Sequence, residues 1–295
     1  TAKTAKPGEK TEFILDKPKR WSPDQPFLYD INVQLFRDGA LLDEVNTYAA
    51  LRKISIAPDK NGVQRLMLNN EFLFQLGLLD QGWWPDGLYT AVSDKALKFD
   101  IEQCKAMGFN LLRKHVKLEP ARWYYHCDRL GMLVWQDMPS GDLGNRWITD
   151  ASEEPIDKIR TAESEGMYKS ELKDMIDALR FFPSIVTWVP FNEAWGQFKT
   201  DEITRWIMDY DKTRLVNCAS GGNFFLSGHI HDYHHYPDPV MHRAELFGKN
   251  QAIVLGEFGG LGLPLEGHTW QGKANWGYQS FENAGALFEQ YSKFV

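Results

Sequence analysis

The stretch MGFNLLRKHVKLEPARWYYHCDRLGMLVWQDMP, residues 107–139, decides the fold of this chain. An apolar run, a helix-like segment and a second apolar run follow one another over residues 110–116, 119–130 and 132–138. Gly108 and Gly131 stand at positions where glycine commonly ends a helix. Two strands joined through a helix are typical of a parallel sheet, because a parallel connection needs a crossover of about a dozen residues or more.

The same alternation continues on both sides of this unit. The expected strands cover residues 72–79, 110–116, 132–138, 185–191, 214–218, 230–236 and 252–257. The expected helices cover residues 93–107, 119–130, 163–181, 200–210 and 281–294. Repeated β-then-α units of this kind predict a (β/α)₈ TIM barrel rather than an open sheet. The link from Cys218 to Ile230 is too short for a full helix, and no eighth strand is recognisable after Glu257.

The beginning of the chain has a different pattern, of β type. Residues 27–36 alternate partly between apolar and polar side chains, Arg37-Asp38-Gly39 reads as a hairpin turn, and short strands follow over 41–56. These strands are fewer than the ~7 of a complete immunoglobulin-like sandwich. We therefore expect a partial immunoglobulin-like β-sandwich at 1–58 and a TIM-barrel catalytic domain at 59–295 that lacks its last strand. Further segments of the same polypeptide would complete both.

Composition excludes several classes of protein. The 295 residues are 43% hydrophobic and 25% charged, as in globular proteins, and the net charge of −7 disfavours a nucleic-acid surface. No apolar run approaches the length of a membrane span. No phosphate-binding or dinucleotide-binding glycine motif is present, so no cofactor is expected. The aromatic fraction of 14%, with 11 Trp, indicates flat apolar surfaces such as those that bind sugar rings.

Two glutamates are the strongest candidates for chemistry. Glu193 follows the apolar strand of residues 185–191, and Glu257 ends the strand of residues 252–257. Catalytic groups of a barrel lie at the C-terminal ends of its strands. Hydrolysis of a glycoside needs one protonated and one ionised carboxyl group, and a separation of about 5–5.5 Å between them predicts retention of configuration. The sequence therefore predicts a glycosidase site.

Five segments together resemble glycoside hydrolase family 2, which includes β-galactosidases, β-glucuronidases and β-mannosidases. They are WSPDQPFLY (21–29), MGFNLLRKH (107–115), CDRLGMLVWQDMP (127–139), the Asn-Glu pair at 192–193 and GEFG (256–259). The resemblance implies hydrolysis of the terminal sugar of a β-glycoside with retention of configuration. It also implies a carbohydrate partner, favours a periplasmic or secreted location and leaves a homo-oligomer possible.

The resemblance also implies roles for individual residues. Glu193 would be the general acid/base and Glu257 the nucleophile. Asn192 would hydrogen-bond the 2-hydroxyl of the sugar, and Arg113 would help to keep Glu257 ionised. Tyr236, or its neighbour His235, would reach Glu257 from the preceding strand. Further candidates for sugar binding lie in the same motifs or in the loops after the strands: Trp84, His115, Trp135, Asp137, Trp195 and Trp270. The alternative, that most of these tryptophans pack loops against the barrel, stays open.

Two other functions remain open at this point. One is a metal-dependent barrel hydrolase that uses the histidines between His229 and His235. His229 and His231 would share one face of a strand, at metal-ligand spacing. The cluster lies on a single strand, however, and few comparable ligands end other strands, so we expect no metal. The other function is a carbohydrate-binding barrel without turnover.

Overall fold

The centre of the molecule is a parallel sheet that curves into part of a barrel. A computed structural model describes residues 2–142, 144–269, 271 and 276–295. Five parallel strands pair in the order β10-β9-β8-β7-β6, and β11 pairs in parallel with β12. Their bounds are β6 Gly77–Asp80, β7 Leu111–Lys114, β8 Leu133–Asp137, β9 Ile185–Val189, β10 Leu215–Val216, β11 Ile230–His234 and β12 Ala252–Glu257. The predicted α/β class with a parallel sheet is confirmed.

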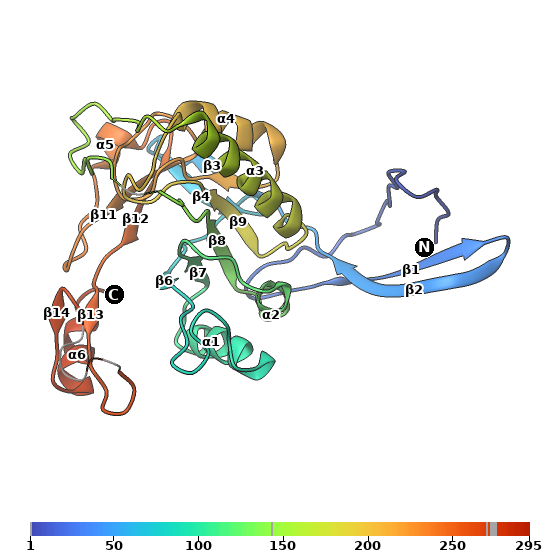
Figure 1. The fold of residues 1–295 in the computed structure, drawn as a ribbon, viewed down its shortest axis with the longest axis horizontal. Helices are drawn as coiled ribbons and strands as arrows, with labels where there is room; N and C mark the ends of the chain where they lie inside the picture. Colours follow the sequence, from blue (N-terminus) through green and yellow to red (C-terminus); the bar gives the residue numbers. More distant parts are fainter. Residues whose placement is uncertain (1, 143, 270, 272–275) are drawn as a thin grey trace.

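Helices cover the outer face of the sheet (Figure 1). Their bounds are α1 Asp94–Ala106, α2 Ala121–Leu130, α3 Ala162–Leu179, α4 Thr200–Tyr210 and the short α5 Ala244–Phe247. The side chain of Ser93 caps α1 by accepting from the amide of Ala96, and Gly131 ends α2 with a left-handed backbone. The link between β10 and β11 carries no helix, as its length predicts. An apolar cluster packs between α1–α4 and the sheet.

The inner face of the sheet changes character along each strand. Leu111 and Leu133 point into a second apolar cluster inside the barrel. Two residues further along, with the side-chain period of a strand, Arg113 follows Leu111 on the inner face. The same face of β8 continues through Trp135 to Asp137, and both are buried. The inner surface is therefore apolar at the N-terminal ends of these strands and charged at the C-terminal ends.

A small antiparallel sheet closes the apolar end of the barrel. It contains β3 (Ile54–Pro58), β4 (Gln64–Leu68) and β5 (Glu71–Phe72). Its buried side chains, with Trp21, join the inner apolar cluster. The expected boundary between residues 58 and 59 falls inside the β3–β4 hairpin, so β3 belongs with the barrel. The strand expected over 72–79 is two elements, because β5 pairs with β4 whereas β6 pairs with β7.

The remaining strand pair of the N-terminal part is a long hairpin of β1 (Tyr29–Arg37) and β2 (Ala40–Ala49), which projects away from the barrel (Figure 1). Val33 pairs with Val45, and both are about half exposed. The opposite face carries a hydrogen-bonded polar group of Asn32, Glu44 and Asn46. Between residues 2 and 52 the structure contains no strand of a sandwich other than these two.

The barrel has an open side between β6 and β12. In the described part of the chain, no strand pairs with the outer edge of either one. A cavity of about 450 Å³ lies there, lined mainly by apolar residues of both strands and by Phe294. The last elements, β13 (Leu261–Gly262), β14 (Gln279–Ser280) and α6 (Ala284–Tyr291), form a small lobe beyond β12 (Figure 1). None of the helices described has the length and apolar character of a membrane span.

Candidate active site

Glu193 and Glu257 come together at the charged end of the barrel. A carboxylate oxygen of each, and one ring nitrogen of His234, all lie within 4.8 Å of one another. The side chain of Glu257 is 7% exposed and that of Glu193 is 16% exposed. The two glutamates therefore share one largely enclosed site, in which Glu193 is the more accessible.

A tight backbone turn aims Glu193 at this site. Strand β9 ends four residues earlier, at Val189, and the amide of Glu193 donates to the carbonyl of Ser220 over 2.8 Å. Glu193 and Ala194 both have a left-handed backbone, with φ of 46° and 63°. This conformation is uncommon for residues other than glycine and is costly, so it is characteristic of functional sites.

Arg113 connects the polar side chains of the site. Its guanidinium binds Asp137 through two parallel hydrogen bonds of 3.0 and 2.9 Å, from Nε and Nη2. Nη1 donates to Oε1 of Glu257 over 2.8 Å, and Nη2 donates to Oδ1 of Asn192 over 2.7 Å. The other amide atom of Asn192, Nδ2, is buried and has no partner among the described residues. One arginine thus orients Glu257 and leaves a free donor on Asn192.

These contacts set the protonation state of Glu257. Burial by itself raises the pKa of this carboxyl, but the nearby Arg113, together with His234, Tyr236 and His115, lowers it by more, and the net pKa lies below the ordinary value. Asp137 behaves in the same way. Burial raises its pKa, but Arg113 and His115 lower it by more, so its net pKa also lies below the ordinary value. Glu257 is therefore ionised at neutral pH.

Tyr236 reaches Glu257 from the neighbouring strand. Its hydroxyl donates to Oε2 of Glu257, the oxygen that Arg113 leaves free. Burial, and then the charge of Glu257, raise the pKa of Tyr236, so the hydroxyl keeps its proton. The ring of Tyr236 stacks on that of Tyr278, with centroids 4.2 Å apart. Tyr278 is half exposed and lies at the rim of the site, a position that sequence reasoning missed.

His115 and Trp195 lie on another side of the carboxylates. Nδ1 of His115 is 3.0 Å from Oδ2 of Asp137 and 3.9 Å from Oε1 of Glu257. The ring of Trp195 approaches that of His115 with centroids 5.9 Å apart. His115 thus lies beside Glu257, and Trp195, which is partly exposed, lies against His115.

His234 occupies the centre of the site, although the sequence pointed to His235. Nδ1 of His235 faces the carbonyl of Asp238 at 2.6 Å, away from the carboxylates. Nδ1 of His234, in contrast, lies 3.0 Å from Oε1 of Glu193. A signal was available, because strand period two places His234 and Tyr236 on one face and His235 on the other.

Two of the predicted tryptophans pack against the apolar clusters in the structure. Trp135 is 2% exposed, lies in the inner apolar cluster and donates from Nε1 to Gln75 over 2.9 Å. It occupies the layer below Asp137 and has no face for a sugar. Trp84 is partly buried and packs against the outer apolar cluster. Trp270 lies outside the described residues.

The histidines of 229–235 do not assemble into one metal site. Nδ1 of His229 accepts from the amide of Val216 over 3.0 Å. His231 stacks on Phe247, with centroids 4.7 Å apart, and faces His242. The one group in the described part of the chain with metal-ligand spacing joins His234 to the two glutamates. There, Arg113 already binds Oε1 of Glu257, and its positive charge opposes a cation.

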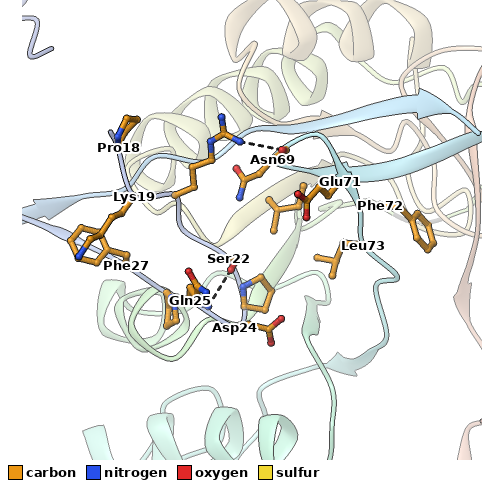
Figure 2. A pocket seen from close by; sticks show the side chains of 14 residues that line it. Pro18, Lys19, Ser22, Asp24, Gln25, Phe27, Asn69, Glu71, Phe72 and Leu73 are labelled. Atoms are coloured by element: carbon orange, nitrogen blue, oxygen red, sulfur yellow. Dashed lines mark hydrogen bonds between the residues drawn. The ribbon is translucent and has the colours of Figure 1, made fainter. Parts of the chain in front are cut away.

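A larger cavity, of about 920 Å³, lies elsewhere on the molecule. Figure 2 shows its lining, which comes from the segment 18–27 and from residues 68–73. Arg20 also lines it and donates from Nη1 to the carbonyl of Asn69 over 3.3 Å. Neither Glu193 nor Glu257 contributes to it. The carboxylate site is therefore the better candidate for chemistry.

Comparison with known proteins agrees with the fold and the motifs. The family model "Glycosyl hydrolases family 2" matches residues 1–52, and "Glycosyl hydrolases family 2, TIM barrel domain" matches residues 84–251. A β-galactosidase of Lactococcus lactis is 26% identical over 219 residues, 72% of this chain and 20% of that protein. A β-galactosidase of Yersinia pestis is 28% identical over 218 residues, 72% of this chain and 19% of that protein. The chain spans about a fifth of the length of these relatives.

Solved structures share the fold. β-Glucuronidase 3 of Bacteroides uniformis matches with a TM-score of 0.65 and 20% identity, over 85% of this chain and 32% of that one. The β-glucuronidase of Parabacteroides merdae matches with a TM-score of 0.64 and 16% identity, over 91% of this chain and 34% of that one. Because the TIM barrel model covers more than half of the residues, the chain belongs to glycosyl hydrolases family 2.

Proposed function

We propose that this protein hydrolyses the terminal sugar of a β-glycoside with retention of configuration, using Glu193 and Glu257. The observation that carries the proposal is the convergence of one oxygen from each carboxylate within 4.8 Å. Retaining glycosidases place their two carboxyl groups about 5–5.5 Å apart, whereas inverting enzymes leave about 6.5–9.5 Å for a water molecule. Membership in the family supports the same conclusion.

The reaction proceeds in two displacements. In the first, an oxygen of Glu257 attacks the anomeric carbon while Glu193 gives its proton to the glycosidic oxygen, whose bond to that carbon breaks. In the second, water attacks the same carbon, Glu193 takes a proton from it, and the bond to Glu257 breaks. The asymmetry of the site fits this division of roles, because Arg113 holds Glu257 ionised and no arginine contacts Glu193 among the described residues.

The surroundings of the carboxylates suit a sugar. Nδ2 of Asn192 offers an unpaired, buried donor for a ring hydroxyl. Trp195 and Tyr278 present partly exposed aromatic rings beside the two glutamates, and such rings stack on the apolar faces of sugars. Relatives named β-galactosidase and β-glucuronidase make β-galactosides and β-glucuronides the first substrates to test.

The test combines two variants with substrates of different leaving groups. Glu257→Gln removes the nucleophile and is expected to abolish turnover of every substrate. Glu193→Ala is expected to impair nitrophenyl glycosides strongly and dinitrophenyl glycosides least, because a dinitrophenolate leaves without protonation. Added azide is expected to rescue Glu193→Ala and to yield a β-glycosyl azide. Rates near the wild-type value in both variants would overturn the assignment, and sugar binding without any hydrolysis by the wild type would favour a binding protein.

A further inference from the structure

We infer that His234 is a positioning residue for Glu193, holding one carboxylate oxygen so that the other is presented to the substrate. This inference rests on the proposed function, because it assigns a task within the same site. His234 is not among the residues that the sequence motifs assign to the reaction. The inference rests on geometry, because the buried imidazole of His234 lies between the two glutamates.

The contact between His234 and Glu193 is direct and enclosed. Nδ1 of His234 lies 3.0 Å from Oε1 of Glu193, and the imidazole is 0% exposed. No other hydrogen-bonding side chain contacts Oε1 in the described part of the chain, and Oε2 has no partner there. A carboxyl group has two oxygens, so a contact that fixes one of them also determines where the other points.

The imidazole itself is held from its other side. Nε2 lies 2.8 Å from the hydroxyl oxygen of Ser220, which donates to Asp232 over 2.6 Å. Arg113 and Glu257 approach Nε2 at 3.4 and 3.6 Å. These neighbours fix the plane of the ring and therefore the direction of Nδ1.

Two glycines make room for this arrangement. A Cβ at Gly221 would lie 2.2 Å from Nδ1 of His234, and a Cβ at Gly256 would lie 2.0 Å from Oδ1 of Asp232. The backbone of Gly221 also has φ of +81°, which disfavours any side chain there. The loop that carries Ser220 and Gly221 accepts the amide hydrogen bond of Glu193 as well. One loop therefore places both the acid/base and the histidine that orients it.

The alternation of β11 places His234, rather than His235, on the face of the site, and strand pairing brings it level with the nucleophile. The register of β11 against β12 shifts between Tyr233 and His234, which brings His234 opposite Glu257. Without the shift, His234 would pair with Gly256. The irregularity thus brings the imidazole level with the nucleophile, while Nδ1 still reaches Glu193.

The chemical consequence concerns the proton of Glu193. In the proposed arrangement Nδ1 of His234 donates to Oε1, so the proton given to the glycosidic oxygen, and later taken from water, is carried by Oε2. Loss of the contact would let the carboxyl group rotate and would impair proton donation more than nucleophilic attack. Substrates that need protonation of the leaving group would then suffer most.

Two substitutions at one position separate this role from simple packing. The amide nitrogen of asparagine can take the place of Nδ1, since both follow Cγ directly, whereas that of glutamine lies one atom further out, near Nε2. His234→Asn is expected to keep kcat/KM within about threefold of the wild type. His234→Gln is expected to lose roughly 10- to 100-fold for phenyl glycosides and less than about threefold for dinitrophenyl glycosides, the range expected when a buried carboxyl oxygen loses its hydrogen-bond partner.

A matched control comes from the same strand. His231 is equally buried, but it contacts His242 and aromatic rings rather than the carboxylates. His231→Asn is expected to change kcat/KM by the same factor for every leaving group. If His234→Gln does not fold, judged by circular dichroism, Ser220→Ala removes the partner of Nε2 instead, and a smaller loss with the same dependence on leaving group is expected.

The outcomes distinguish the two proposals. Equal losses of His234→Gln and His234→Asn across all leaving groups, or wild-type values in both, would overturn the positioning role while Glu193→Ala and Glu257→Gln remain inactive. Wild-type activity in Glu193→Ala and Glu257→Gln would instead overturn the proposed function.

Discussion

Nη1 of Arg113 lies 2.8 Å from Oε1 of Glu257, and the two side chains are 4% and 7% exposed. The same guanidinium is fixed by two hydrogen bonds to Asp137, so its direction does not depend on Glu257. A buried positive charge in this position favours the ionised form of the carboxyl group. The charge state that a nucleophile requires is therefore set before any substrate binds.

Removal of this positive charge is expected to change the pH dependence of the reaction. Because Arg113 lowers the pKa of Glu257, Arg113→Gln raises that pKa, and the acidic limb of the kcat/KM profile moves to higher pH. The profile of a dinitrophenyl glycoside measures the shift. Arg122→Gln, which removes an exposed partner of Asp94, is the control with an unchanged profile. An unmoved acidic limb in Arg113→Gln would contradict the role given to Arg113.

The hydroxyl of Tyr236 is expected to matter for the nucleophile and not for folding. Tyr236→Phe keeps the ring that stacks on Tyr278 and deletes the hydrogen bond to Glu257. A hydrogen bond to a charged group contributes about 1.5–3 kcal/mol, so kcat/KM is expected to fall roughly 10- to 100-fold. Tyr210→Phe, which deletes a hydroxyl contact to Asp177 on the outer helices, is the matched control. Equal rates in the two variants would argue against a contribution of Tyr236.

A buried carboxyl outside the site is expected to make stability depend on pH. Burial raises the pKa of Asp128 to about 6, although contacts with Ser184 and Tyr48 oppose the rise. The folded state then binds more protons than the unfolded state between about pH 4 and pH 6. The stabilisation that this proton contributes is fully present below about pH 4. The free energy of unfolding therefore falls by roughly 3 kcal/mol as the pH rises through 6.

Asp128→Asn tests this dependence. The variant has no group to titrate at this position, so its free energy of unfolding is expected to lose this dependence between pH 4 and pH 6. Urea denaturation at a series of pH values measures the effect. If wild type and variant show the same slope, another group is responsible for the pH dependence.

Metal ions are expected to inhibit rather than to assist. The group of Glu193, His234 and Glu257 has the spacing of a metal site, but its carboxylates are those required by the proposed reaction. We expect treatment with EDTA to leave activity unchanged and Zn²⁺ to compete with substrate. His234→Asn removes one ligand and is expected to weaken that inhibition. Inactivation by EDTA that added metal reverses would favour a metal-dependent hydrolase instead.

The sequence predicts where the strands end. It predicts only in part which side chains of each strand point into the site. Glu257 was proposed from the apolar strand that ends at it, and Arg113 from the resemblance to glycoside hydrolase family 2. His234 was missed although the alternation of a strand places it on the same face as Tyr236; the sequence does not show the register shift that brings it opposite Glu257. Trp135 was misplaced because the sequence does not say which layer of the barrel an inward residue occupies.

The division between the N-terminal part and the barrel was also difficult to predict. Strands β3 and β4 have the same local pattern as β1 and β2, so no local signal separates them. Contacts between residues far apart in the sequence decide that β3 and β4 belong to the barrel. Ile54 and Leu66, for example, pack with Leu133 inside it. Contacts of this kind depend on the assembled fold and cannot be read from neighbours in the sequence.

The left-handed backbone at Glu193 makes the residue that turnover requires less favourable for thermostability than asparagine would be. Asparagine adopts this conformation more readily than glutamate or glutamine. Glu193→Asn is therefore expected to melt at a higher temperature than Glu193→Gln, in a calorimetric comparison of the two, although both lose the acid/base. Mutants selected for heat resistance alone would drift towards asparagine or glycine at this position, and glutamate persists only while hydrolysis itself is under selection.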